Sequence, residues 1–599
     1  MNKKREKIVF IKEILVTLIV FFCNHVQAQT AMVNVQARHL TSLNGKWNVL
    51  LDPGNIGSWK KFWIEPKPEK KTDFFEYSFV GAPKLNVPGD FNSQLCELTF
   101  YEGAVWYKKT FTVSKKKESR QFLHFGAVNY IADVYLNEEK LGSHEGGFTP
   151  FQFEITDRIK EGYNTLIVKV DNHRLENGIP GYGYDWLNYG GITRDVNIIE
   201  TRNTYIDDYF IQLKKGSLNN VLGWIQLNGE KTNQKIKVKI PELNIVYKTK
   251  TDNSGYAKID FSSRFKLWSP ESPKLYKVIL ESETDSIVDE IGFRSIQVKG
   301  SEVLLNNKPI FIKAVNIHEE NPLKKSRAFS LEDAKLLLNS AKELGCNLVR
   351  LAHYPHSENM IKEAEKMGLM VWSELPVYQN IKFSDSLVPK KMDIMLQEMI
   401  SRDKNRCGVV LWSLSNETYS STPNRDKALV DLTEKCKAID STRLITHVIN
   451  TQGYTNNSFN VWDKLYNYSD LIAINEYIGW YVSWQGKPSE ATWKVDFPDK
   501  PVFISEFGAE ALYGNKNVPT DQASSWSEEY QEQIYKNQLE MFKTIPNLSG
   551  VCPWILYDYK SLGRMHPVYQ KGYNRKGLIS ENGEKKKAWY IMNEYYNKN

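Results

Sequence analysis

The chain has 599 residues, which at roughly 150 residues per domain corresponds to three or four domains. Its 16 Trp, 32 Tyr and 27 Phe residues can fill several hydrophobic cores, so the composition excludes an intrinsically disordered or low-complexity protein. Lys and Arg number 78 against 71 Asp and Glu, a formal net charge of +7. For a chain of this length, that small excess argues against a nucleic-acid-binding protein.

The first 28 residues have the pattern of a secretory signal. Basic residues at positions 3, 4, 5 and 7 precede an apolar run at 14–23, and Val26-Gln27-Ala28 supplies the small residues of a cleavage site. Because a bilayer span needs about 20 apolar residues, we expect no membrane span and an exported, periplasmic or extracellular bacterial protein. A buried N-terminal helix is the alternative. Acylation of Cys23 is disfavoured by the bulky Phe22 before it.

The other five cysteines, at positions 96, 346, 407, 436 and 552, are far apart, and none belongs to a Cys-x-x-Cys pair. This spacing indicates neither a disulfide framework nor a zinc site. We expect most of them to be buried free thiols, and the spacing leaves open whether any two pair. We expect no metal and no cofactor.

From about residue 38 to 300 the sequence has the pattern of β-sandwiches. Residues 235–240 alternate Lys-Ile-Lys-Val-Lys-Ile, as a half-buried strand does, and short apolar runs at 134–136 and 166–168 are bounded by turn residues. Regularly spaced short strands predict two sandwich domains. A polar stretch at 201–204 and a second break near Gly300 suggest domains at 29–203 and 204–299.

After residue 300, apolar strands alternate with amphipathic helices. Ser330-Leu331-Glu332-Asp333 has the pattern of a capping box, and Gly345 ends the helix that follows. Eight strands and intervening helices predict a (β/α)8 barrel over 300–599, and a doubly wound sheet is the alternative. The predicted strands are 311–315, 348–351, 370–372, 409–414, 444–448, 471–474, 502–505 and 551–555.

Two carboxylic acids directly follow predicted strands, where barrel enzymes carry their catalytic residues. Glu417 follows the fourth strand and Glu506 the seventh, so they would face each other across the barrel mouth. Facing carboxyl groups suit cleavage of a glycosidic bond, because one protonates the leaving oxygen while the other attacks or stabilises the anomeric carbon. Glu374 and Glu476 also follow strands and compete for these roles. Simple rim ion pairs would give the same pattern.

Short motifs follow one another in a fixed order along the chain. They include Leu-Asn-Gly-Lys-Trp at 43–47, Val-Pro-Gly-Asp-Phe-Asn at 87–92, Asn-Tyr-Gly-Gly-Ile-Thr-Arg at 188–194, Trp-Ser-Pro at 268–270 and Gly-Phe-Arg at 292–294. Together with Asn-Glu at 416–417, these motifs resemble glycoside hydrolase family two, which includes β-galactosidases, β-mannosidases and β-glucuronidases. The resemblance implies an N-terminal jelly-roll β-sandwich, an immunoglobulin-like β-sandwich and a C-terminal TIM barrel.

The resemblance also implies a retaining mechanism. Asn416-Glu417 looks like the acid/base pair of the family, with Asn416 expected to hydrogen-bond the sugar 2-hydroxyl, and Thr418 stands where many members have Pro. The segment 504–508 looks like the nucleophile segment, with Glu506 as the nucleophile. Retention requires the two carboxyl groups to lie about 5–5.5 Å apart.

Asn574-Arg575-Lys576 resembles the Asn-x-Lys motif with which β-glucuronidases bind the substrate carboxylate. An ammonium and an amide would converge on that carboxylate through charge-assisted hydrogen bonds, each worth ~1.5–3 kcal/mol. Tyr477 and Tyr481 lie in a segment similar to glucuronidase sequence, which implies places beside the nucleophile and near the carboxylate. The Lys run at 585–587 illustrates the alternative for this region, a solvated basic surface.

The resemblance implies further substrate contacts. Trp554 is expected to form an aromatic wall for the sugar, with a core Trp as the alternative, and His318 and His353 match barrel-mouth histidines of the family. Glu154 is taken to stand in for a jelly-roll Asp that reaches the glucuronidase site, which leaves a galacturonide open. Gln570 replaces a common Arg, so we expect the carboxylate site to be completed differently.

The sequence therefore predicts an exo-acting retaining β-glucuronidase that hydrolyses terminal β-D-glucuronides of small molecules or oligosaccharide ends. The short segment at 376–399 predicts an open mouth. A β-galacturonidase or β-galactosidase of the same family is one alternative, and a catalytically inactive carbohydrate-binding protein is an alternative of another class. Because family members often form dimers or tetramers, a homo-oligomer is a further expectation.

Overall fold

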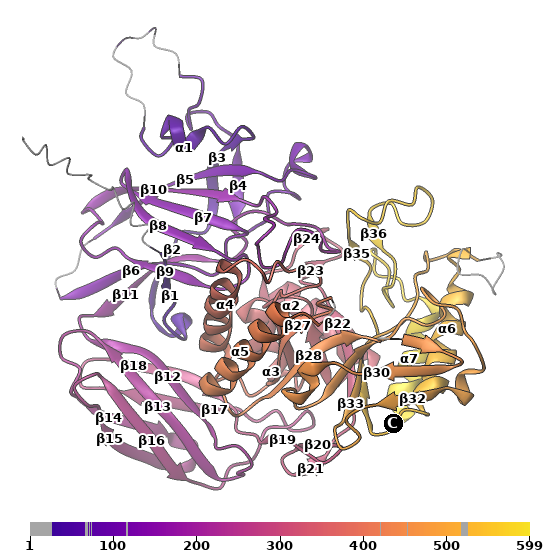
Figure 1. Cartoon of the computed structure of the whole chain (residues 1–599). Helices are drawn as coiled ribbons and strands as arrows, with labels where there is room; N and C mark the ends of the chain where they lie inside the picture. Colours follow the sequence, from indigo (N-terminus) through magenta and orange to yellow (C-terminus); the bar gives the residue numbers. More distant parts are fainter. Residues whose placement is uncertain are drawn as a thin grey trace, which may run out of the picture.

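The structure is a computed structural model, and it describes residues 27–598 except 66–69, 71, 73–74, 115–117, 420, 452 and 517–524. Residues 1–26 of the predicted signal, Cys23 included, lie outside the described residues. In Figure 1 the chain passes from a purple group of strands through a magenta group to a larger orange and yellow part that contains most of the helices.

The first body is a β-sandwich, as predicted. Its strands are β1 (Gln29–Thr30), β2 (His39–Ser42), β3 (Gly45–Asp52), β4 (Lys84–Val87), β5 (Ala104–Val113), β6 (Ser119–Phe125), β7 (Ile131–Leu136), β8 (Glu139–Glu145), β9 (Phe151–Glu154), β10 (Gly162–Asp171) and β11 (Val196–Arg202), with a short helix α1 (Gly57–Lys60). One sheet has the order β1-β9-β6-β11-β2 and the other β4-β3-β5-β10-β7-β8. Alternate apolar residues such as Trp47, Tyr107 and Phe125 fill the core between them.

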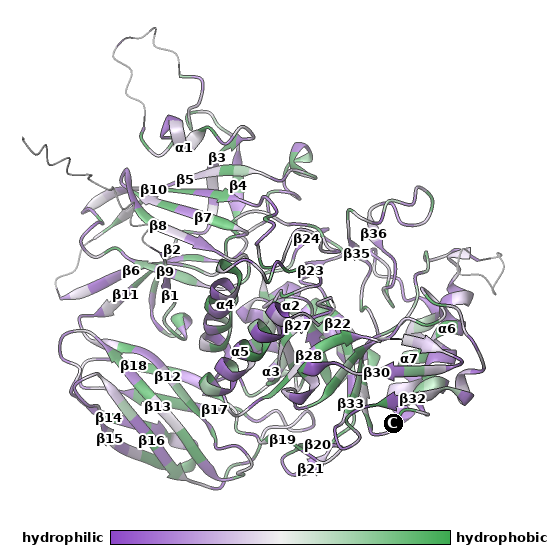
Figure 2. Cartoon of the chain, in the orientation of Figure 1, coloured by the Kyte–Doolittle hydropathy of each residue, from purple (hydrophilic) through white to green (hydrophobic). Residues whose placement is uncertain are grey.

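The second body is a smaller sandwich with an immunoglobulin-like arrangement. Its strands are β12 (Tyr205–Leu213), β13 (Asn220–Asn228), β14 (Lys235–Ile240), β15 (Ile245–Lys250), β16 (Tyr256–Ser262), β17 (Tyr276–Glu281) and β18 (Ser286–Ile291). They form the sheets β12-β13-β16 and β15-β14-β17-β18. The alternation at 235–240 is confirmed as β14, in which Ile236, Val238 and Ile240 are fully buried. Figure 2 shows hydrophilic and hydrophobic residues interspersed along these strands.

The third body contains a closed parallel barrel. In order around the barrel its strands are β22 (Ile312–Ile317), β25 (Leu348–Leu351), β26 (Met370–Glu374), β27 (Val409–Asn416), β28 (Leu444–Asn450), β31 (Ile472–Asn475), β33 (Val502–Glu506) and β34 (Leu548–Val551). Every predicted barrel strand is present, and the doubly wound alternative is wrong. The eighth strand is the least accurate prediction, because β34 shares only Val551 with the predicted 551–555. Pro553, which has no backbone N–H to donate to a neighbour, interrupts the predicted segment.

Helices cover the outside of the barrel (Figure 1). They are α2 (Leu331–Leu344), α3 (Glu358–Lys366), α4 (Leu387–Asp403), α5 (Pro423–Ile439), α6 (Glu528–Phe542) and α7 (Lys587–Lys598). Ser330 and Asp333 form the predicted capping box of α2, and Gly345 ends that helix with φ at 97°. Leu337 and Leu338 on α2 are buried in the core between helices and strands.

Short strands extend the barrel at its two ends. The sheet β19-β20-β21 (Ile296–Lys299, Glu302–Leu305 and Lys308–Pro309) packs apolar residues against the barrel interior. Three further sheets are β23 (Glu320–Asn321) with β24 (Ser326–Arg327), β29 (Gly453–Thr455) with β30 (Ser458–Val461) and β32 (Thr492–Val495), and β35 (Tyr559–Lys560) with β36 (Tyr573–Asn574). Asn574, one of the predicted site residues, ends β36.

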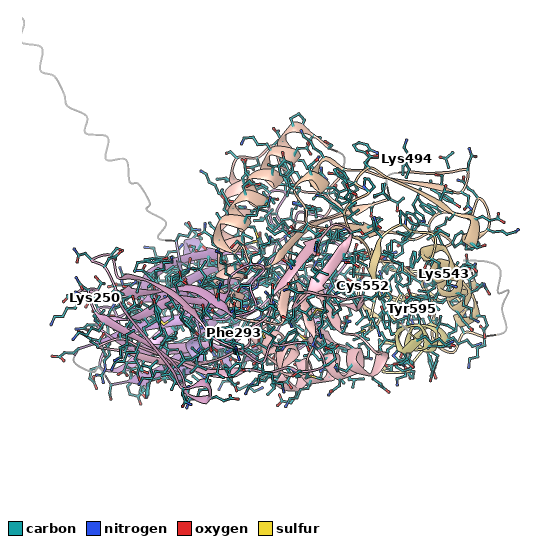
Figure 3. All side chains as sticks on the ribbon, turned by 90° about the horizontal axis from the view of Figure 1, so that it is seen from below. Lys250, Phe293, Lys494, Lys543, Cys552 and Tyr595 are labelled. Atoms are coloured by element: carbon teal, nitrogen blue, oxygen red, sulfur yellow. The ribbon has the colours of Figure 1, made fainter. Side chains whose placement is uncertain are left out.

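The five cysteines of the described part are free thiols, and all except Cys96 are buried. Figure 3 shows Cys552 within the barrel, whereas Lys250 and Lys494 lie at the periphery. The prediction of mostly buried free thiols is thus confirmed. Within the described ranges, none of the helices combines the length and the apolar character needed to cross a membrane.

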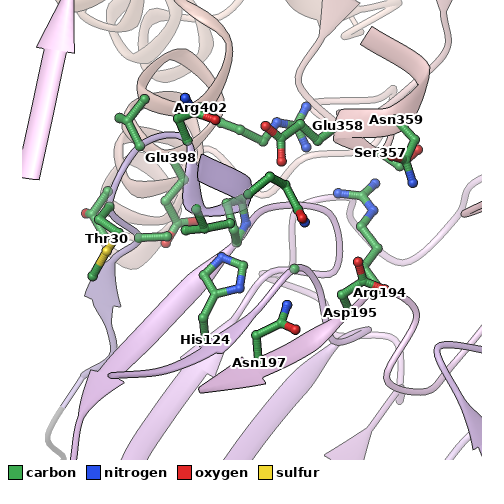
Figure 4. Close-up of a pocket in the computed structure, with 18 of the residues that line it drawn as sticks. Thr30, His124, Arg194, Asp195, Asn197, Ser357, Glu358, Asn359, Glu398 and Arg402 are labelled. Atoms are coloured by element: carbon green, nitrogen blue, oxygen red, sulfur yellow. The ribbon is translucent and has the colours of Figure 1, made fainter. Parts of the chain in front are cut away.

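Buried polar contacts fix the jelly roll to the barrel. Glu319, two residues after β22, pairs with Arg194 of the jelly roll at 3.1 Å and with Arg327 of the barrel domain at 2.7 Å. Glu398 on α4 contacts His144 on β8 at 3.0 Å. Figure 4 shows Arg194 and Glu398 at this junction, around a small cavity of about 70 Å³. The jelly roll is therefore held in one orientation over the barrel mouth.

Arg294 joins the second sandwich to the barrel, and its replacement tests this joint. Its guanidinium is buried, which lowers its pKa to about 9, and it donates to the carbonyl oxygens of Cys407, Thr442 and Val409 at 3.1, 3.0 and 2.6 Å. Arg294→Met leaves these carbonyls without that donor. We expect a loss of about 2–5 kcal/mol in unfolding free energy, measured as a lower thermal midpoint. Lys308→Met, on exposed β21, is the control, and equal midpoints for both variants would contradict the prediction.

Candidate active site

The carboxyl ends of the barrel strands surround a cavity of about 390 Å³. Glu506 is the last residue of β33, and Glu417 directly follows the end of β27. The two carboxyl groups that the sequence singled out thus line one cavity. Six of the other predicted site residues also line it: His353, Tyr477, Tyr481, Trp554, Asn574 and Lys576.

Glu506 is held from below by Arg350, a fully buried residue of β25. Its Oε1 accepts a hydrogen bond from Arg350 at 2.7 Å, and its Oε2 accepts one from the Tyr477 hydroxyl at 2.8 Å. Arg350 also donates to both oxygens of Glu374 at 3.0 Å. Burial alone would raise the pKa of Glu374, but Arg350 and a hydrogen bond from His353 outweigh it, so that pKa is low.

Glu417 has different surroundings. Its Oε1 accepts a hydrogen bond from the Asn475 amide at 2.7 Å, and its Oε2 accepts one from the Gln379 amide at 2.9 Å. Burial and then the charge of Glu506 raise the pKa of Glu417, and the two amides offset only part of that rise. Two carboxyl groups that interact, one beside an arginine and one beside amides, have surroundings that favour different protonation states.

The backbone of Glu417 is in an unusual conformation. Its φ of 50° lies in the left-handed region, which a non-glycine residue rarely adopts. Its backbone N–H donates to the Val448 carbonyl of the neighbouring strand at 2.9 Å. Such strained residues cluster at functional sites, where the surrounding structure enforces them. The turn after β27 therefore directs the Glu417 side chain toward the cavity.

The competing carboxyl groups are placed differently. Glu374 is fully buried beneath the cavity and engaged by Arg350. Glu476 does line the cavity, where its carboxyl contacts the Thr451 hydroxyl and accepts a hydrogen bond from the Ile478 backbone N–H at 2.7 Å. Burial raises the pKa of Glu476 to about 7. Glu374 thus supports the site from beneath, and Glu476 forms part of its wall.

Asn416 lies just beneath the cavity. Its Oδ1 accepts a hydrogen bond from Arg350 at 2.8 Å, while its Nδ2 is buried and has no hydrogen-bond partner among the described residues. Buried donors are normally satisfied, so an unpaired one beside a cavity is a group that a ligand can use.

A buried ammonium lies at another part of the same cavity. Lys576 Nζ donates to the Tyr481 hydroxyl at 2.8 Å and lies 3.3 Å from Glu510. Burial lowers the pKa of Lys576, but Tyr481 and Glu510 outweigh it and hold that pKa above its ordinary value. Asn574 lies beside it and donates to Asp185 at 3.2 Å. For Lys576, the alternative of a solvated basic surface is wrong.

Asp185 and Arg564 also line the cavity, and sequence reasoning missed both. Asp185, between β10 and β11, pairs with Arg564 at 2.5 Å, and Arg564 lies 3.3 Å from the Tyr481 hydroxyl. The sequence held one signal for each residue. Asp185 lies three residues before the 188–194 motif. Arg564 is a basic residue ten positions before Asn574, and the replacement of a common Arg by Gln570 had indicated that another residue completes the carboxylate site.

The prediction for Glu154 is corrected. Glu154 ends β9, and its carboxylate pairs with Arg120 of the adjacent strand β6 at 2.6 Å, outside the cavity. The jelly-roll carboxylate that reaches the barrel mouth is Asp185. The error has a physical reason, because the irregular segment between β10 and β11 faces the barrel whereas β9 lies within a sheet of the sandwich.

His353 and Trp554 form an aromatic layer at the cavity. His353 stacks on Trp554, with ring centroids 4.8 Å apart, and contacts Glu374 at 2.7 Å through Nδ1. His318 lies behind this layer rather than at the cavity, with its ring 5.3 Å from Trp554 and 4.3 Å from Tyr559. Burial lowers the pKa of His318 well below its ordinary value. His318 therefore supports the wall without lining the cavity.

A parallel barrel with paired carboxyl groups at its mouth and a jelly roll that contributes a side chain define a carbohydrate-cleaving hydrolase. Comparison with protein families places the chain within that class. Residues 40–202 match the sugar-binding domain of glycosyl hydrolases family 2, residues 204–294 match a second domain of that family, and residues 296–598 match its TIM-barrel domain. The chain belongs to glycosyl hydrolases family 2 and is a glycoside hydrolase. The domain boundaries set from the sequence stay predictions.

Individual relatives cover nearly the whole chain. A β-glucuronidase of Streptococcus agalactiae is 29% identical over 583 residues, which cover 86% of this chain and 93% of the relative. A β-galactosidase of Thermoanaerobacterium thermosulfurigenes is 29% identical over 521 residues, covering 82% of this chain and 69% of the relative. Among solved structures, an uncultured Clostridium sp. β-glucuronidase has a TM-score of 0.81 and 26% identity, covering 96% of this chain and 100% of that one.

The interaction between the two carboxyl groups can be measured directly. The charge of Glu506 raises the pKa of Glu417, so Glu506→Gln is expected to lower the pKa of Glu417. Carbon-13 NMR of labelled glutamate carboxyls across a pH series reports this shift. Glu510→Gln, a change beside Lys576, serves as the matched control and is expected to leave Glu417 unchanged. An unaltered Glu417 titration in Glu506→Gln would show that the two groups do not interact.

Proposed function

We propose that the protein is an exo-acting retaining β-glucuronidase, with Glu506 as the nucleophile and Glu417 as the acid/base. One observation carries the proposal: a single cavity holds two interacting carboxyl groups and, at another part of its wall, a buried charged lysine. Similarity to β-glucuronidases from several organisms supports it. Export, argued from residues 1–28, and assembly into a homo-oligomer are further parts of the proposal.

In the first step, Glu506 attacks the anomeric carbon while Glu417 donates its proton to the glycosidic oxygen. The carbon–oxygen bond breaks, the leaving group departs as an alcohol, and the sugar becomes an ester of Glu506. The raised pKa keeps Glu417 protonated to higher pH, so the rate of this step falls as pH rises through that pKa. Asn416 Nδ2, the unpaired buried donor, is available for the sugar 2-hydroxyl.

In the second step, Glu417 removes a proton from water, which attacks the same carbon and releases the sugar and Glu506. The ester has consumed the charge of Glu506, which was one cause of the raised pKa of Glu417. That pKa therefore falls during the reaction, and the former acid becomes a base when one is needed. Two displacements at one carbon return the original anomer.

Recognition of a uronic acid is proposed for the part of the cavity that holds Lys576 and Asn574. A buried ammonium and an amide can bind the sugar carboxylate through charge-assisted hydrogen bonds. Arg564 adds a second cation beside the Tyr481 hydroxyl. A neutral sugar would displace water from these groups without offering them a carboxylate, which is what makes such sites selective.

Two alternatives differ from this proposal in testable ways. A β-galactosidase or β-galacturonidase would share the carboxyl pair, and the similarity to a β-galactosidase is a reason to include both sugars in a substrate panel. A catalytically inactive carbohydrate-binding protein would have no need of two interacting carboxyl groups in one cavity.

Lys576→Ala tests the specificity. We expect its kcat/KM on an aryl β-glucuronide to fall roughly 10- to 100-fold, because one charge-assisted contact is lost, while its kcat/KM on the aryl β-glucoside is expected to change little. The measurement is the ratio of the two kcat/KM values. Lys585→Ala, outside the cavity, is the matched control. An unchanged ratio for Lys576→Ala would remove the argument for a uronic acid.

Glu417→Gln tests the acid role. We expect kcat/KM on an alkyl β-glucuronide to fall ~10²–10⁴-fold, since the leaving oxygen must then depart unprotonated. On a dinitrophenyl β-glucuronide, whose leaving group needs no proton, the loss should be far smaller. Glu434→Gln, on the exposed surface of α5, controls for the substitution itself. Equal losses on both substrates would contradict the role.

A further inference from the structure

Glu417 marks where the leaving group must lie, because the glycosidic oxygen has to come within hydrogen-bonding reach of its carboxyl. Gln379 and Asn475 contact that carboxyl directly. In the barrel order, β28 is the neighbour of β27, whereas β34, which precedes Asn574 and Lys576, lies three strands beyond β28. Residues that follow β28 are thus on the Glu417 side of the cavity, away from the proposed carboxylate site.

The Glu417 side of the cavity is polar. Gln379 lines it from the loop after β26, and Thr451 directly follows β28. Glu476, which directly follows β31, belongs to this side because its carboxyl contacts the Thr451 hydroxyl. Gln379 uses one N–H on Glu417, and its Oε1 lies 3.5 Å from the Tyr419 hydroxyl. This side therefore presents amide, hydroxyl and carboxyl groups to the leaving group.

Thr451 and Glu476 form a hydrogen-bonded pair that is consistent with a neutral carboxyl. The Thr451 hydroxyl lies within hydrogen-bonding reach of the Asn475 carbonyl, at 3.3 Å, and of Glu476 Oε2. A hydroxyl has one proton and cannot donate to both. A protonated Glu476 satisfies the whole chain, because it donates to Thr451, which then donates to Asn475. Burial, which raises the pKa of Glu476 to about 7, favours this form.

We propose that Gln379, Thr451 and Glu476 form a leaving-group subsite for an uncharged sugar, so that the substrate is a saccharide capped by the uronic acid. Sugar hydroxyls can pair with all three side chains. An apolar alcohol of the same size would displace water from the remaining hydrogen-bonding positions of these groups and offer no hydrogen bond in return, which costs binding energy. The proposal rests on the proposed function and adds the class of leaving group to it.

The experiment compares two substrates with the same glycon. One is cyclohexyl β-D-glucuronide, and the other is a disaccharide in which β-D-glucuronic acid is linked to a ring hydroxyl of glucose. Both leaving groups are six-membered rings, and they differ mainly in their hydroxyls. For the unaltered full-length protein we expect kcat/KM to be roughly tenfold or more higher on the disaccharide.

Variants test whether the subsite causes the preference for the disaccharide. Thr451→Val and Glu476→Leu are expected to lower kcat/KM on the disaccharide ~5- to 50-fold, while cyclohexyl glucuronide changes less than about threefold. Glu476→Gln, which can donate to Thr451 as the protonated acid does, is expected to retain the preference. Thr455→Val is the matched control, because Thr455 is the exposed last residue of β29. Thr451→Val keeps the test decisive if Glu476→Leu fails to fold.

An equal or higher kcat/KM on cyclohexyl glucuronide in the unaltered protein would overturn the proposal. Equal losses on both substrates in Thr451→Val and Glu476→Gln would do the same, because they would indicate a structural role. Failure of the proposed function would give a different result, in which neither glucuronide is cleaved but an aryl galactoside is cleaved. The same pair of leaving groups on galactose would then decide the nature of the subsite.

Discussion

The site depends on one buried cation. Arg350, inside the barrel on β25, holds Glu506 at 2.7 Å, Glu374 at 3.0 Å and the Asn416 amide oxygen at 2.8 Å. Burying a guanidinium costs free energy unless each of its donors finds a partner. Here the partners are side chains of the site itself, so the hydrogen bonds that satisfy Arg350 also position those side chains. In the proposed mechanism, Arg350 thereby fixes the attacking carboxylate, and it leaves the Asn416 N–H₂ group free to donate. Glu417, whose two partners are amides, can hold a proton beside it.

The jelly roll completes the cavity instead of merely flanking it. Glu319 and Arg194 fix the sandwich over the barrel, and this places Asp185 against Arg564 and Asn574. Asp185 offsets the charge of Arg564 as Glu510 offsets that of Lys576. A bound carboxylate would therefore enter a site whose cations are already positioned by fixed partners, which limits the reorganisation needed on binding.

The sequence predicted the parts of the site that a repeating pattern controls. Glu417 and Glu506 end apolar strands, and parallel strands bring their carboxyl ends together, so their meeting followed from the barrel. Lys576 was predicted only because its Asn-x-Lys motif resembles that of a known family. Asp185 and Arg564 lie in irregular segments whose path no periodicity describes, and Glu154 was misplaced because a regular strand was taken for the segment that reaches the barrel. Where a loop runs depends on tertiary contacts such as the Arg194–Glu319 pair, which sequence spacing does not reveal.

The central claim is that Glu506 becomes covalently attached to the sugar while Glu417 stays free. It is tested most directly with 2-deoxy-2-fluoro-β-D-glucuronyl fluoride. Its fluorine at carbon 2 slows both formation and hydrolysis of the ester, and the good fluoride leaving group at carbon 1 keeps formation the faster step, so the ester accumulates. After incubation and digestion, mass spectrometry locates the modified peptide. The account predicts a single sugar ester on Glu506. An ester on any other residue, such as Glu476, would contradict it, as would unmodified protein that releases the inverted α-anomer from a β-glucuronide.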